Sequence, residues 1–103
     1  MKDIIKKTKE IHDLFPNKYD KRSRLLDLME ELGELAQAVH IVEGFKTTND
    51  PSKVKTVDDV ADGVCDILYE LILLSQDYNL DLEHEYLSML GRLKKRVASG
   101  EFD

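Results

Sequence analysis

Apolar residues recur at spacings of three and four along most of the chain, which is the period of amphipathic α-helices. This pattern predicts helices over about residues 2–15, 20–44, 56–78 and 81–100, with turn-forming residues between them. No sustained period-two run and no hairpin dipeptide indicates a strand. We therefore expect one all-α domain over residues 1–103, built as a four-to-five-helix bundle.

The second predicted helix carries three carboxylates within its apolar pattern: Glu30, Glu31 and Glu34. Residues three and four apart share a helix face, so Glu31 and Glu34 are neighbours, and Glu30 lies one turn before Glu34. The apolar positions of this stretch recur at the same period and predict its core face, namely Leu28, Leu32, Leu35, Ala36 and Val39. The acids are therefore expected to border the core.

The third predicted helix carries a second acidic column, formed by Asp59, Asp62 and Asp66. The helix dipole favours acids in a first turn, which accounts for Asp58 and Asp59. Asp62 and Asp66 lie beyond that turn, so the dipole does not explain them. Two facing columns of like charge predict a cation between them, and oxygen ligands favour Mg²⁺, with Mn²⁺ as the alternative.

Charge and composition narrow the function classes. The formal net charge of −6 and the pI near 5.0 argue against general nucleic-acid binding, which usually needs a basic face. The single cysteine, Cys65, rules out a disulfide within one chain and predicts a reducing cytoplasm. No apolar run is long enough for a signal peptide or a membrane span. So short a chain has a limited core, which favours oligomerisation.

Other catalytic chemistries have little support in the sequence. The three histidines are scattered, Cys65 has no base beside it, and zinc-type Cys/His clusters are absent. Di-iron bundles use Glu-x-x-His on two helices, and this chain has no such motif. A carboxylate-held divalent metal site remains, because it can neutralise a polyphosphate and activate water. The expected reaction is hydrolysis of a phosphoanhydride.

Basic residues in two places are candidates for binding the phosphates of a substrate. Lys46 lies in the loop over residues 45–55, and Lys94 and Arg96 lie near the end of the fourth helix. Each has an alternative explanation. Loop lysines commonly serve solubility, and basic residues in a last turn complement the helix dipole.

The stretch from Glu30 to Ala36 resembles the Glu-Glu-x-x-Glu helix of the MazG-like all-α nucleoside triphosphate pyrophosphohydrolases. The stretch from Asp66 to Leu74, followed by residues 79–82, is similar to the second metal helix of that superfamily. The basic C-terminal end also resembles the family's. Together the similarity spans about residues 20–102.

This resemblance implies a Mg²⁺-dependent enzyme that cleaves an NTP or dNTP to the monophosphate and pyrophosphate. It implies metal ligands at Glu31, Glu34 and Asp66, with Glu30 as a further ligand or as a residue that positions water, and a homodimer or homotetramer. The family's second motif is Glu-x-x-Asp, but Gly63 stands at the glutamate position, so Asp62 is expected to replace it. The departure leaves open a non-catalytic helical oligomer that binds nucleotide or metal, and a structural bundle without a site.

Overall fold

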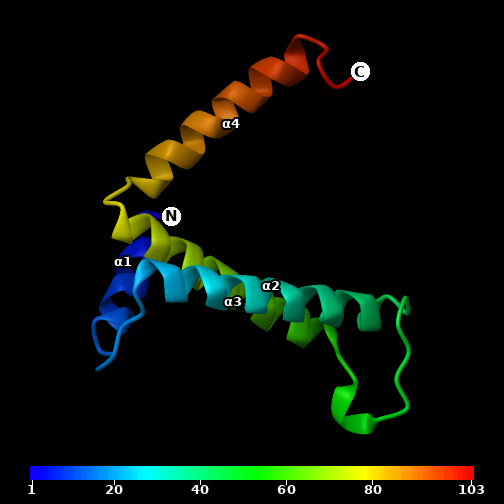
Figure 1. Cartoon of the computed structure of the whole chain (residues 1–103). Helices are drawn as coiled ribbons and strands as arrows, with labels where there is room; N and C mark the ends of the chain where they lie inside the picture. The colour runs from blue at the N-terminus through cyan, green and yellow to red at the C-terminus, as the bar shows by residue number, and fades with distance from the viewer.

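The computed structural model describes residues 1–103 and contains four α-helices, one short 3₁₀ helix and no strand. In chain order these are α1 (Lys2–His12), α2 (Lys21–Val42), η1 (Pro51–Lys53), α3 (Val57–Asp77) and α4 (Leu82–Ala98) (Figure 1). The all-α prediction is confirmed. None of the helices is both long enough and apolar enough to cross a membrane.

Side-chain caps begin three of the four helices. The Asp20 carboxylate accepts a hydrogen bond from the backbone N–H of Ser23 at 2.7 Å, and Asp81 caps α4 in the same way. Thr56 and Asp59 form a capping box at the start of α3. These contacts satisfy N–H groups that have no partner within a helix, so the beginnings of these helices follow from local sequence.

The ends of the helices also have local causes. Gly44 and Gly100 follow α2 and α4 with φ values of +77° and +82°, which favour glycine. Asn79 takes φ +55° between α3 and α4. The first helix ends at His12, earlier than expected, and the backbone N–H groups of Leu14 and Phe15 then donate to Ile11 and His12, three residues back, in a tighter turn.

Helices α2 and α3 lie side by side along most of their length, and α1 packs against α3 (Figure 1). The fourth helix projects away from this body (Figure 1). The radius of gyration is 17.3 Å, compared with about 13 Å for a compact chain of this size. The single chain is therefore extended, and α4 has little packing of its own.

Few side chains are buried in the single chain, namely Arg24, Ala38, Glu70, Ile72, Leu73 and Ser75. Part of the apolar stripe expected to form the core of α2 is exposed: Leu32 is 58% exposed and Val39 37%, whereas Leu28 and Leu35 are half-buried. The reason is that α2 turns the side carrying Arg24 and Ala38 toward its neighbours. The sequence-based assignment of the core face therefore holds for Leu28 and Leu35 and is wrong for Leu32, Ala36 and Val39 in the isolated chain.

A buried ion pair ties the start of α2 to α3. The Arg24 guanidinium donates to Glu70 at 3.2 Å and to Asp77 at 2.9 Å. Burial raises the pKa of the Glu70 carboxyl, Asp27 raises it further, and Arg24 opposes both effects. Lys21 adds a cation–π contact, 4.4 Å from the centre of the Tyr78 ring.

We expect Arg24→Met to destabilise the fold by roughly 3–5 kcal/mol, because it leaves the Glu70 charge buried without a partner. Urea unfolding followed by circular dichroism measures this change. Arg96→Met is the matched control, since the Arg96–Glu101 pair is about half exposed and its loss should change stability little. Equal effects of the two substitutions would show that the buried pair has no special role.

Candidate functional site

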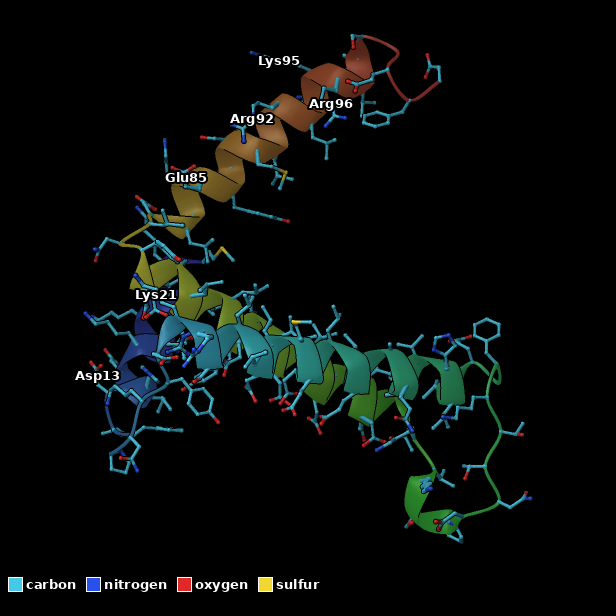
Figure 2. The ribbon with its side chains drawn as sticks, in the orientation of Figure 1. Asp13, Lys21, Glu85, Arg92, Lys95 and Arg96 are labelled. Carbon is cyan, nitrogen blue, oxygen red and sulfur yellow. The ribbon has the colours of Figure 1, made fainter.

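A cleft of about 150 Å³ lies between α2 and α3 and gathers five carboxylates. Its lining residues are Glu31, Glu34, Leu35, Ala38, Lys55, Asp59, Asp62, Gly63 and Asp66. All four residues predicted as metal ligands, Glu31, Glu34, Asp62 and Asp66, are among them. In Figure 2, oxygen-bearing side chains gather along the lower side of α2 and α3, the side on which the green loop before α3 lies.

Glu31 lies among the negative charges gathered in this cleft, and the pKa of its carboxyl responds to them. Partial burial raises the pKa of its carboxyl, the charges of Asp66, Glu34 and Asp27 raise it further, and a hydrogen bond with Asp66 acts in the same direction. Glu31 therefore holds a proton more readily than an ordinary glutamate. A proton or a cation at this position relieves the repulsion among the acids.

The groups that line the cleft suit a hard cation, because the acids supply oxygen atoms and no cysteine, histidine or methionine is among them. The side chains do not converge on one point: no three His, Cys, Asp or Glu side chains lie close enough to hold a metal ion. Glu34, Asp62 and Asp66 are exposed, so their rotamers are free to change. Binding of an ion by three of these acids therefore requires some of their side chains to move.

Gly63 marks the close approach of α3 to α2. A Cβ atom at this position would lie 3.0 Å from Leu35 Cδ1 and 3.4 Å from Leu35 Cβ. A side chain there would require Leu35 to shift by a few tenths of an ångström, which gives a packing reason for glycine at this position. The neighbouring Asp62 lines the cleft instead. Gly33 has no such constraint, because a Cβ atom there would meet nothing within 4 Å.

The remaining predicted site residues lie outside this cleft. Glu30 lines a separate surface depression with Tyr19 and Ser23, and Lys46 lines another on the loop. Arg96 lies near the far end of the projecting α4 (Figure 2) and pairs with Glu101 at 2.7 Å. The single chain thus brings neither Glu30 nor the three predicted phosphate-binding residues, Lys46, Lys94 and Arg96, to the acids.

Lys55 lies at the cleft, and the sequence did not distinguish it from the other loop lysines. It comes directly before Thr56, the N-cap of α3, so helix capping fixes its position beside the first acid of the column. The backbone N–H of Thr56 lowers the pKa of Asp59, and the Lys55 charge lowers it further. Adjacency to the cap was the local signal that could have identified Lys55.

A second cavity of about 260 Å³ lies one helical turn from the acidic cleft. It is lined by His12, Phe15, Asn17, Tyr19, Arg24, Asp27, Tyr69, Glu70 and Leu73. Asp27 and Glu70 are each four residues from a cleft acid, Glu31 and Asp66, so the two hollows are neighbours along the helix pair. The Tyr69 hydroxyl lies 3.3 Å from His12 Nδ1, and burial followed by the Arg24 charge lowers the pKa of His12.

Comparisons with protein-family models, with curated proteins and with solved structures found no match to this chain. The assignment of function therefore depends on the residues of the site.

We expect Glu31→Gln to raise the melting temperature at neutral pH in the presence of EDTA. The raised pKa means that protonated Glu31 adds stability below its ordinary value of 4.5, and this contribution is lost as the pH rises through the raised value. Glutamine keeps the uncharged state, so the gain should vanish in acid.

Differential scanning fluorimetry across pH measures this difference. Glu10→Gln, which removes an exposed acid from α1, changes the net charge by the same amount and serves as the control. An equal gain from the control would attribute the effect to net charge instead of the cleft.

Proposed function

We propose that the protein is a Mg²⁺-dependent nucleotide pyrophosphohydrolase that cleaves an NTP or dNTP to the monophosphate and pyrophosphate. The observation that carries this proposal is the gathering of Glu31, Glu34, Asp62 and Asp66 on one cleft, with Lys55 at its edge. Acids alone would repel a polyphosphate, so divalent ions must mediate the contact. The exposed thiol of Cys65 supports a reducing cytoplasm as the proposed location.

The reaction consumes one water molecule. The water oxygen forms a bond to the α-phosphorus, and the bond from that phosphorus to the α–β bridging oxygen breaks. The bridging oxygen leaves with the bonding electron pair as part of pyrophosphate. Bound Mg²⁺ would supply charge neutralisation for the phosphates. Glu31 is the candidate general base, since its carboxylate lines the cleft beside the acids that would hold the ions and can accept the proton from water.

The neighbouring cavity supports a nucleoside as the other part of the substrate. It combines the aromatic rings of Phe15, Tyr19 and Tyr69 with the polar side chains of Asn17 and Asp27. Planar bases stack on aromatic rings, and amide or carboxylate groups can bond their edges. Its place one helical turn from the acids allows one ligand to reach both hollows.

A screen of common and modified nucleoside triphosphates tests the proposal through Mg²⁺-dependent release of pyrophosphate. We expect turnover of at least one triphosphate, and Glu34→Gln or Asp66→Asn should lower it about 100-fold or more, because each removes a charge that binds the ion. Glu10→Gln again serves as the control and should keep full activity. Absence of turnover with both Mg²⁺ and Mn²⁺ would contradict an enzymatic role.

A non-catalytic relative that binds nucleotide or metal is the second candidate. The absence of converged ligands and the close packing at Gly63 favour it. The same screen separates the two functions, because triphosphate binding that raises the melting temperature without any cleavage indicates the binder.

We propose further that a second copy of the chain covers α4 and completes the helical bundle. The fourth helix carries a stripe of exposed apolar residues at helical spacing, formed by Tyr86, Leu90, Leu93 and Val97. The outer face of α2 exposes a second apolar set, which includes Met29 and Leu32. Exposed apolar surface on this scale is typical of subunit interfaces, and its burial would supply the core that one chain lacks.

Sedimentation velocity tests this assembly, and we expect a dimer or tetramer of the 11.9 kDa chain. Leu90→Glu should shift the protein toward the monomer, because it places a charge within the apolar stripe. Lys95→Glu is the matched control, since Lys95 lies on the opposite side of α4. A monomeric wild-type protein at micromolar concentration would contradict the proposed interface.

A further inference from the structure

A polar depression adjoins the acidic cleft at the end nearest the loop. Its volume is about 200 Å³, and its lining residues are Glu34, Gln37, Ser52, Lys53 and Lys55, with no apolar side chain among them. Glu34 and Lys55 also line the cleft, so the two hollows adjoin. We refer to these two hollows and the aromatic cavity together as the groove. The groove therefore changes from acidic to cationic along its length.

The donors of this depression are available to a ligand. The ion pairs of the structure join Arg24 to Glu70 and Asp77, and Arg96 to Glu101, so neither Lys53 nor Lys55 is paired with a carboxylate. The Ser52 hydroxyl is committed, because it donates to Asp50 at 2.8 Å. Two ammonium groups and the Gln37 amide remain, and they suit an anion with several oxygen atoms.

The loop segment that presents these lysines is locally ordered. Asp50 caps η1 by accepting a hydrogen bond from the Ser52 backbone N–H at 3.0 Å, and Pro51 fixes the first residue of that turn. Lys53 ends η1, and Lys55 comes directly before the Thr56 cap of α3. Both lysines are thus held next to capped helix ends, which limits the conformational freedom of their backbone.

The three hollows follow one another along α2 and α3 in a fixed chemical order. The aromatic cavity near α1 lies on one side of the acids, and the lysines lie on the other side. A nucleoside triphosphate whose nucleoside occupies the aromatic cavity would place its α-phosphate at the acids and its outer phosphates at the lysines. This order matches the proposed bond cleavage, because the outer two phosphates form the leaving group.

We infer that Lys53, Lys55 and Gln37 form the subsite that binds the leaving diphosphate of the substrate. This inference rests on the proposed function and fixes the direction in which a substrate lies along the groove. The lysines offset the charge that develops on the bridging oxygen as its bond to the α-phosphorus breaks. They also hold the pyrophosphate product until it dissociates.

Calorimetric titration of the full chain with inorganic pyrophosphate in the presence of Mg²⁺ tests the subsite. We expect the double variant Lys53→Ala/Lys55→Ala to bind pyrophosphate about tenfold more weakly or worse, because it loses two charge-assisted contacts. The double variant Lys7→Ala/Lys9→Ala is the matched control, since these exposed lysines of α1 line none of the three hollows and their loss changes the net charge equally. It should bind within about twofold of the wild type.

Equal affinity of the double variant and the wild-type protein, or no binding of pyrophosphate by the wild-type protein, would overturn the subsite. Failure of the proposed function gives a different result. Pyrophosphate binding that depends on the two lysines, without turnover of any triphosphate, would support the subsite and contradict the enzymatic function. Turnover of a triphosphate combined with unchanged pyrophosphate affinity in the double variant would support the enzymatic function and contradict the subsite.

Discussion

The close packing of α2 along α3 is the constraint on which the rest of the structure depends. At one end Arg24 holds the helices together through Glu70 and Asp77, and near the middle Gly63 lets α3 approach Leu35. This packing forces carboxylates of the two helices to face one another across a narrow cleft. Helix packing therefore brings like charges together there, and a bound cation would reduce the repulsion between them.

Much of the helical framework could be predicted because its signals are local. Asp20 and Asp81 each accept a hydrogen bond from an N–H group of the turn that follows, and Asp59 accepts one from the Thr56 N–H. These local signals identified where the three helices begin. The gathering of Glu31 and Glu34 on one face follows from helical spacing in the same way. Hence the acids on each helix were predictable before any tertiary contact was known.

Periodicity predicted only part of the face of α2 that meets α3, because it identified Leu35 but not Arg24. Apolar residues lie on more than one side of α2, and the interface uses the side with Arg24 and Ala38, whereas Met29 and Leu32 remain exposed. A buried arginine is rare without a partner, and its partners lie far away in sequence, so nothing local marked it. For the same reason the pattern could not show that α4 projects from the body. Lys55 differs from Lys46 only in its place directly before the Thr56 cap.

The capping box at the start of α3 has a consequence for how many acids can serve a ligand at once. One carboxylate oxygen of Asp59 accepts a hydrogen bond from the Thr56 backbone N–H at 2.7 Å. An ion that recruited this oxygen would compete with the helix for it and would loosen the first turn of α3, where Lys55 joins the loop. Occupancy of the acidic cleft and the order of the loop are in this way coupled through a single side chain.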